Sequence, residues 1–308
     1  MSPYGYPQLL AAAPLSHRQL WARWILGTHS DVFLPEMSDR VEGLNRVDPI
    51  ELGQPFSAPG LRRDDLLVIA ASEGRHCVIA DAPLACRVVL FDWTGRGVPV
   101  EANPHGFEVV SVATECKGHL IEEAVHRLGL PPEGCFAGFV DDDVVLRFSD
   151  VVSLLAVARI HRLSAVQPAV TLNSSLCNEY PWLRQRTSLL LHRVPVVEIM
   201  APFIRSDLLS CSLPFLRGVR SGYGFDRFAL PLCAEHLGDW RFAVVDSCPM
   251  SHARPLSSVH RRFSNGLLSK EEELLIRQRL MLAMGFDVDP DVYTRLEAAI
   301  ESAPGRLV

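Results

Sequence analysis

The sequence predicts an α/β fold built on a largely parallel sheet. Between residues 64 and about 255, short aliphatic runs alternate with helical patterns, which is the order of elements typical of such folds. The runs at residues 66–70 and 135–140 are almost continuously apolar, as in strands that are buried on both faces. Residues 117–128 place apolar side chains three and four positions apart, which predicts an amphipathic helix between strands.

Each further element follows from a pattern of the same kind. Strands are expected at residues 66–70, 86–91, 107–112, 135–140, 165–170, 194–200 and 242–245. Helices are expected at residues 16–27, 117–128, 149–163, 205–216, 225–237 and 270–284. The polar, irregular stretch 171–193 is predicted to be a long loop, and long loops in compact domains often serve as lids or binding loops.

The chain is expected to consist of a core with a segment on either side. Residues 1–63 hold many Pro and Gly residues and little periodicity, which predicts an N-terminal extension packed on the core. Residues 64–256 carry the alternation of strands and helices and form the expected main domain. Residues 257–308 are expected to form a C-terminal helical tail outside the sheet, because residues 270–284 are amphipathic and acidic at their start.

Composition favours a globular protein of the cytoplasm. Of the 308 residues, 48% are hydrophobic and 21% charged, which is ordinary for this class. The net charge of −6, without a basic stripe, argues weakly against a nucleic-acid partner. The eight cysteines include no CxxC pair, so reduced thiols are expected rather than a disulfide framework. No run of about 18 apolar residues predicts a transmembrane segment, and the first residues make a poor signal peptide.

Three consecutive carboxylates, Asp141, Asp142 and Asp143, follow the apolar run that ends at residue 140. Ligands of open α/β sheets bind beyond the carboxyl ends of the strands. Carboxylates at that edge can hold a hard divalent cation, and Mg²⁺ is usually bound by one or two of them together with substrate phosphates. In an extended segment, Asp141 and Asp143 would share a face and Asp142 would point away. A solvated acidic turn that caps the next helix remains an equal alternative.

Two later segments are expected to end at the same edge of the sheet. Gly222 and Gly224 bracket Tyr223 before a helix, so the backbone there can approach a ligand closely. Asp226 then lies at the helix N-terminus, where a carboxylate is stabilised. His252 ends a polar turn after the last predicted core strand, where an imidazole can complete a mixed oxygen and nitrogen metal site. The plainer alternatives are a helix cap for Asp226 and a surface or core histidine for His252.

Residues 66–255 resemble the nucleotide-diphospho-sugar transferases of the GT-A fold, and in particular a poorly characterised family of plant and bacterial proteins. Five motifs carry the resemblance in the same order: Phe-Val-Asp-Asp-Asp at 139–143, Gln-Pro-Ala at 167–169, Val-Glu-Ile-Met-Ala-Pro at 197–202, Gly-Tyr-Gly-Phe-Asp at 222–226, and Val-Val-Asp-Ser at 244–247 followed by His252. Tyr223 departs from the family's pattern, which has a tryptophan at that place.

The resemblance implies a metal-dependent enzyme. In GT-A enzymes the acidic motif binds Mn²⁺ or Mg²⁺, which bridges the diphosphate of the donor and stabilises the leaving group. Here it assigns Asp141 and Asp143 to the metal, with His252 as a candidate third ligand, and Asp226 to the role of general base. The residues that would contact the donor are Ala71, Ser72, Glu73, Asp92, Lys117, Asp141, Asp142, Glu198, Gly222, Tyr223 and Gly224. An arginine-paired Glu198 and a solvated Lys117 remain open as plainer roles.

The predicted function is transfer of a sugar from a nucleoside-diphosphate-sugar, a UDP-sugar first, to an acceptor hydroxyl with inversion, catalysed by residues 64–256. The acceptor is open between a glycan, a lipid-linked sugar, a natural product and a protein. A nucleotidyltransferase, which also places paired carboxylates after a strand, is the second enzyme hypothesis. A catalytically degenerate domain that binds a nucleotide or a partner is the third. The absence of a phosphate loop, a GxGxxG and a GxSxG motif disfavours ordinary ATPases, dinucleotide enzymes and triad hydrolases.

Overall fold

The computed structural model describes residues 5–27, 61–174, 180–254 and 261–302. Within them, one nine-stranded sheet consists of β1 (Leu66–Ala71), β2 (Arg87–Asp92), β3 (Glu108–Ser111), β4 (Phe136–Val140), β5 (Val144–Val145), β6 (Ala165–Val170), β7 (His192–Arg193), β8 (Phe203–Arg205) and β9 (Phe242–His252). The α-helices are α1 (Leu15–Leu26), α3 (Lys117–Leu128), α4 (Phe148–Ile160), α5 (Ser206–Leu216), α6 (Leu230–His236), α7 (Ser269–Ala283) and α8 (Pro290–Ser302).

The sheet confirms the predicted α/β class with mostly parallel strands. Its order is β3-β2-β1-β4-β8-β6-β9-β5, and β7 pairs with β9 outside this path. The strands β1, β2, β3 and β4 are parallel neighbours, as are β6 and β9, while β8 is antiparallel to both β4 and β6. The carboxyl ends of β1, β2, β4, β6 and β9 therefore lie along one edge, where ligands of such sheets bind.

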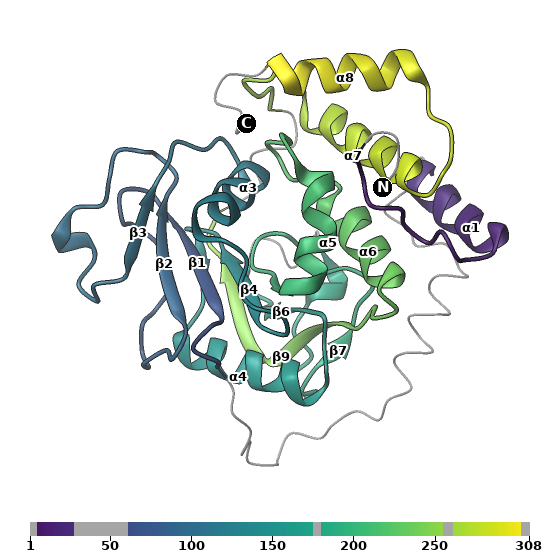
Figure 1. Cartoon of the computed structure of the whole chain (residues 1–308). Helices are drawn as coiled ribbons and strands as arrows, with labels where there is room; N and C mark the ends of the chain where they lie inside the picture. The colour runs from purple at the N-terminus through teal and green to yellow at the C-terminus, as the bar shows by residue number, and fades with distance from the viewer. Residues whose placement is uncertain (1–4, 28–60, 175–179, 255–260, 303–308) are drawn as a thin grey trace.

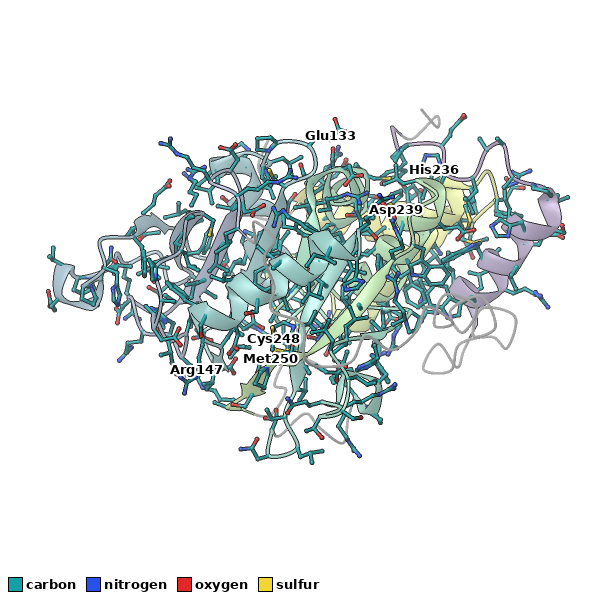
Figure 2. The ribbon with its side chains drawn as sticks, turned by 90° about the horizontal axis from the view of Figure 1, so that it is seen from below. Glu133, Arg147, His236, Asp239, Cys248 and Met250 are labelled. Atoms are coloured by element: carbon teal, nitrogen blue, oxygen red, sulfur yellow. The ribbon has the colours of Figure 1, made fainter. Side chains whose placement is uncertain are left out.

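Helices cover the sheet, as their apolar faces require. The helix α4 packs on β6 and β9, and α5 packs on β4 and β8, on opposite sides of the sheet in Figure 1. Figure 2, seen from below, shows α4 across the sheet, with Asp239 near the start of β9 and Cys248 and Met250 near its other end. The strands β1, β4 and β6 are buried along their whole length, which explains why Gln167 in β6 is their one polar side chain.

The two flanking segments pack on each other beside the sheet. In Figure 1, α1 near the N-terminus lies along α7 near the C-terminus. The Leu9 N–H donates to the Ala283 carbonyl (2.9 Å), and Nη1 of Arg277 donates to the Ile25 carbonyl (2.9 Å). Trp24 of α1 is buried and meets the ring of Phe228 edge-on, with centroids 5.1 Å apart. Of the predicted N-terminal extension, residues 28–60 lie outside the described part of the chain.

Two predicted elements differ from the structure. Residues 194–200 are mostly buried but are not a strand, because several of their backbone groups bond to side chains instead of a ladder: the Glu198 N–H donates to Gln167, and the Pro195 carbonyl accepts from Trp240 (3.0 Å). The last strand, expected to end at residue 245, continues to His252. Its register against β6 shifts between Pro168 and Ala169, where a proline cannot donate to the ladder.

The other predicted helices and strands agree with the structure to within a few residues, and α3 and β6 agree to the residue, whereas β5, β7, β8 and α8 were not predicted as separate elements. No helix among the described residues is both long and apolar enough to span a membrane.

Candidate active site

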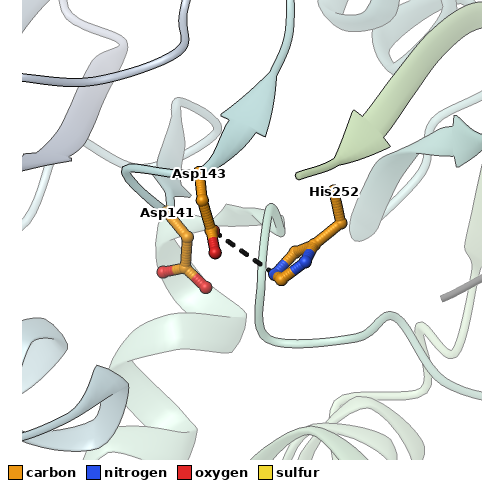
Figure 3. A group of neighbouring side chains, drawn as sticks. All are labelled: Asp141, Asp143 and His252. Carbon is orange, nitrogen blue, oxygen red and sulfur yellow. Dashed lines mark ion pairs between the residues drawn. The ribbon is translucent and has the colours of Figure 1, made fainter. Parts of the chain in front are cut away.

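The turn after β4 brings two carboxylates to the end of β9. A hydrogen bond from the Val144 N–H to the Asp141 carbonyl (3.2 Å) closes this turn, so the acidic triplet is not the extended segment considered above. Val144 then pairs with His252 in the antiparallel β5–β9 ladder. This register brings Asp141, Asp143 and His252 together, with one ligand atom of each within 4.8 Å of the others. Figure 3 shows the two carboxylates on the same side and the His252 ring facing Asp143.

The three side chains form a donor set that suits a divalent cation. Oδ1 of Asp143 lies 3.3 Å from Nε2 of His252, within the roughly 4–5 Å that two metal–ligand bonds span. Nδ1 of His252 bonds to the Arg254 carbonyl oxygen, so in the neutral ring Nδ1 carries the proton and Nε2 offers a lone pair. Because the Asp143 oxygen and that lone pair are both acceptors, either a proton on the ring or a shared cation must lie between them.

Lys117 is buried behind the cluster and holds Asp141. Its Nζ donates to Oδ1 of Asp141 (2.6 Å) and to the carbonyl oxygens of Phe139 (3.0 Å) and Met200 (3.2 Å). The ammonium has three protons, and these contacts supply three acceptors. Lys117 is therefore neither a solvated lysine nor, in this arrangement, directed at a phosphate. Burial raises the pKa of Asp141, and the nearby ammonium opposes that rise.

Replacing this lysine tests its effect on the cluster. Lys117→Met leaves the Asp141 carboxylate without its ammonium, so the pKa of Asp141 rises further and its proton competes with a cation. We expect Mn²⁺ affinity to fall at least about tenfold at neutral pH, because the proton then competes with the cation for the Asp141 carboxylate. Calorimetric titration at pH 6 and pH 8 should show the larger deficit at pH 6. Arg63→Met, which removes an exposed cation before β1, is the control and should bind as the wild type; an equal loss in both variants would contradict this role.

A cavity of about 170 Å³ lies beside the cluster and gathers most of the predicted site. Its walls come from the start of α3, the turn after β4, the loop around Tyr180 and Trp182, the segment before β8, the loop before α6, the end of β9 and α7. The predicted residues that line it are Lys117, Asp141, Glu198, Gly222, Tyr223, Gly224, Asp226 and His252. Residues from seven separate parts of the sequence thus converge on one space next to three candidate metal ligands.

Asp226 lies in a π-helical turn, Phe225–Ala229, that precedes α6. Gly224 occupies the N-cap position with a φ of +86°, a conformation that glycine adopts without strain. Asp226 is therefore not the helix cap. Its Oδ1 accepts the Arg227 N–H (2.8 Å), and the Ile199 N–H also bonds to the carboxylate. Single π turns of this kind occur often at functional sites.

Glu198 and Asp226 form an acidic pair in the cavity. Burial raises the pKa of Glu198 to about 8, and the Asp226 charge adds to the rise. Burial likewise raises the pKa of Asp226 to about 6, although the Arg227 guanidinium lowers it. Oε2 of Glu198 accepts the Met200 N–H (2.5 Å), which fixes the side chain. Two carboxyl groups whose pKa values are pushed apart can act as one base and one protonated hydrogen-bond donor.

Four residues predicted to contact the nucleotide do not line this cavity: Ala71, Ser72, Glu73 and Asp92. The buried Asp92 carboxylate accepts the N–H groups of Glu73 (3.0 Å), Thr94 (3.2 Å) and Gly97 (2.7 Å), so it organises the turns after β1 and β2. Asp142 belongs neither to the three-residue cluster nor to the cavity lining, and its carboxylate accepts Nε1–H of Trp93 (3.3 Å). These residues lie at the carboxyl ends of β1, β2 and β4, along the same edge of the sheet.

Several lining residues were not among the predicted ones. Tyr180 and Trp182 come from the long loop that the sequence marked as a possible lid, without indicating which of its residues matter. Lys270 and Glu273 come from α7, which was expected to be a tail outside the sheet. No local pattern distinguishes them, because an acidic first turn is an ordinary feature of helices.

Asp246 fastens the long loop next to the cavity. Its carboxylate, 1% exposed, accepts the Arg186 N–H (2.6 Å) and is bonded to Nδ1 of His192 (2.7 Å). Nε2 of His192 is bonded to the Trp182 carbonyl (2.7 Å). The Val-Val-Asp-Ser motif thus positions a loop whose aromatic side chains line the cavity. Residues 175–179 of this loop lie outside the described part of the chain.

No protein-family model matches the sequence, and no curated protein matches it either. Among solved structures, TarS residues 1–349 from S. aureus are 15% identical with a TM-score of 0.46, over 77% of this chain and 70% of that one. The same TarS segment with UDP-GlcNAc is 12% identical with a TM-score of 0.46, over 76% and 70%. GalNAc-T7 with UDP, GalNAc and Mn²⁺ is 9% identical with a TM-score of 0.46, over 87% and 63%. These likenesses are distant, with TM-scores below 0.5.

Proposed function

We propose that this protein is a metal-dependent glycosyltransferase that moves a sugar from a nucleoside-diphosphate-sugar to an acceptor hydroxyl. The observation that carries the proposal is the Asp141–Asp143–His252 cluster beside the cavity that also holds Asp226. A sugar transfer needs two features together: positive charge for the departing diphosphate and a base for the attacking hydroxyl. Both would act within one small space here.

The cluster would hold Mn²⁺ or Mg²⁺, which would supply Lewis-acid stabilisation of the departing diphosphate. Lys117 keeps Asp141 oriented from behind, and the Arg254 carbonyl keeps Nε2 of His252 directed at the cluster. Asp142 and Glu198 are proposed to contact the donor sugar. The turns at residues 71–73 and Asp92, at the ends of β1 and β2, are proposed to hold the nucleotide, with uridine as the first base to test.

Asp226 is the proposed general base. Its pKa, raised to about 6, leaves the carboxylate ionised at neutral pH yet basic enough to accept a proton from a hydroxyl. A base that activates the acceptor supports direct displacement on the face opposite the diphosphate, so we propose inversion at the anomeric carbon. Tyr180, Trp182 and Tyr223 surround the space where the acceptor would enter, and aromatic faces are suitable contacts for the apolar faces of sugar rings.

A donor screen tests this function. Nucleotide-sugars with different bases and sugars are added with Mn²⁺ or with EDTA, and thermal shift and release of nucleoside diphosphate are measured. The proposal predicts stabilisation and slow hydrolysis of at least one donor, and only with the cation. Pyrophosphate exchange between a nucleoside triphosphate and a sugar phosphate would instead indicate a nucleotidyltransferase. Metal-dependent binding without any turnover would indicate a degenerate domain, and no binding of any nucleotide would remove both enzyme hypotheses.

The pH dependence of transfer follows from the acidic pair. The base must be ionised, so the rate should fall as pH drops through about 6, the value to which burial raises the pKa of Asp226. If Glu198 acts as a protonated donor to the substrate, the rate should also fall above about 8. Initial rates at saturating donor between pH 5 and pH 9 should therefore give a bell-shaped pH profile. In Glu198→Gln, whose amide always donates, the alkaline limb should disappear; an unchanged alkaline limb would contradict the donor role.

A further inference from the structure

Glu272 of α7 is fully buried and contacts the loop that leads to Asp226. Its Oε2 accepts the Ser221 N–H (2.7 Å), and its Oε1 accepts the Arg220 N–H (3.0 Å) and Nδ2–H of Asn265 (2.6 Å). A carboxylate that is shielded from water requires hydrogen-bond donors from the protein. Hydrogen bonds to a charged acceptor are among the stronger ones in proteins. Glu272 thus joins α7 to this loop through two backbone amides.

The loop held by Glu272 has little freedom on its other side. Gly222, with a φ of +82°, packs so closely that an added Cβ would lie 2.6 Å from Cδ1 of Ile199. An added Cβ on Gly118, in the first turn of α3, would lie 2.5 Å from the Gly222 nitrogen. The His119 N–H donates to the Arg220 carbonyl (3.0 Å). The loop is therefore enclosed between α3 and the residues before β8 on one side and α7 on the other.

The same helix also forms part of the cavity wall. Lys270 and Glu273 line the cavity, and their side chains form an ion pair with Nζ 3.1 Å from Oε2. An added Cβ on Gly224 would lie 3.2 Å from Cγ of Glu273, so the start of the π turn rests directly on α7. The loop and the turn that carries Asp226 therefore share one support.

We propose that Glu272 is a positioning residue for the transfer reaction: by holding the amides of Arg220 and Ser221, it fixes the loop 220–224 and places Asp226 at the cavity. The inference rests on the proposed function, because Asp226 is the proposed base. It makes α7 part of the active site, although α7 follows the main domain in sequence and was expected to be a tail.

Glu272→Gln tests this role with little change in size. Glutamine keeps one acceptor oxygen, but its NH₂ group then faces one of the two backbone amides, so one bond is replaced by a contact between donors. We expect kcat to fall by about 10- to 100-fold, as for a small misplacement of a catalytic group. KM for the donor and Mn²⁺ affinity should stay near the wild-type values. Amide hydrogen exchange across residues 219–224 should accelerate.

Glu297→Gln is the matched control, because it weakens the C-terminal segment without touching the loop. Glu297 of α8 accepts Nε–H (2.8 Å) and Nη2–H (2.9 Å) of Arg279, which is buried in α7. This variant should have a lower Tm, but wild-type kcat and wild-type exchange across residues 219–224. If it loses as much kcat as Glu272→Gln, general stability of α7 explains the effect and the positioning role is wrong.

Two further outcomes remain decisive. If Glu272→Gln does not fold, Asn265→Ala removes the side-chain donor to Glu272, together with the acceptor of the Leu267 N–H. It should show the same separation of kcat from KM to a smaller extent; unchanged kcat and unchanged exchange would overturn the proposal. If the wild-type protein transfers no sugar, the proposed function fails by itself. The exchange comparison between Glu272→Gln and Glu297→Gln still decides whether Glu272 holds the loop.

Discussion

Asp226→Asn should bind the cation and the nucleotide as the wild type does, yet lose sugar transfer by about 10²–10⁴-fold, the usual contribution of a general base. The amide has nearly the same shape, and its oxygen can still accept the Arg227 N–H that the carboxylate accepts at 2.8 Å. It cannot take a proton from an acceptor hydroxyl. Initial rates at saturating donor and acceptor, with calorimetric binding of UDP and Mn²⁺ alongside, separate the two effects.

The same substitution should stabilise the protein above pH 6. Burial raises the pKa of Asp226 to about 6 in the folded state, against an unfolded value near 3.9. An acid whose folded pKa is raised costs stability as pH increases from the unfolded pKa to the folded one, and the cost is constant above both. Because Asp226 is partly exposed to the cavity, we expect a gain of roughly 1–2 kcal/mol at pH 7 in Asp226→Asn and almost none at pH 3.5.

Asp287→Asn, at an exposed position before α8, is the control for loss of a carboxylate, and it should change neither the rate nor the Tm. Transfer by Asp226→Asn at the wild-type rate would show that Asp226 is not the base. A product with retained anomeric configuration, read by NMR, would contradict the direct displacement.

Asp143→Ala should abolish cation-dependent binding of a nucleoside diphosphate. The Asp143 carboxylate is one of three candidate ligands and is only 3.3 Å from Nε2 of His252. Losing a ligand leaves only two protein ligands, so we expect UDP affinity in the presence of Mn²⁺ to fall at least about 100-fold, because even the loss of a hydrogen-bond partner of a metal ligand costs about 10- to 100-fold. Calorimetry of UDP with Mn²⁺ and with EDTA measures the loss in the variant and in the wild type.

Asp64→Ala removes an exposed carboxylate at the opposite end of β1, and is the control for the change in net charge. It should keep the wild-type difference between Mn²⁺ and EDTA. Equal affinity of the wild type for UDP in Mn²⁺ and in EDTA, or wild-type UDP affinity of Asp143→Ala in Mn²⁺, would contradict the proposed metal site.

The sequence predicts the strands and helices correctly where burial in the core requires a regular pattern of apolar residues. The strand β6 and the helix α3 match the predictions residue for residue, because β6 is apolar except for Gln167 and α3 has apolar residues at helical spacing. Residues 194–200 are equally apolar, but an apolar run alone does not distinguish a strand from another buried segment. There the buried Glu198 accepts a backbone amide, and Gln167 accepts that of Glu198, so side chains replace the ladder.

The positions of the acidic residues after β4 were predictable from the sequence, whereas the residues that contact or orient them were not. Asp141 and Asp143 follow a buried strand, and the chain direction alone places them at the carboxyl edge. The position of His252 depends on the pairing of the two-residue strand β5 with the end of β9. No sequence pattern predicts this pairing. Lys117 and Glu272 are similar cases, because each acts through contacts with residues far along the chain: Asp141 for one and Ser221 for the other.

Pulsed electron paramagnetic resonance of Mn²⁺ tests most directly whether Asp141, Asp143 and His252 hold a cation that binds the diphosphate of a nucleotide. With one equivalent of Mn²⁺ and UDP bound to the protein, the spectrum should contain a ¹⁴N coupling from His252 and a ³¹P coupling from the diphosphate. The ¹⁴N coupling should vanish in His252→Ala. A spectrum with ³¹P coupling but no ¹⁴N coupling, the same as that of Mn²⁺ and UDP in buffer, would contradict the proposed site.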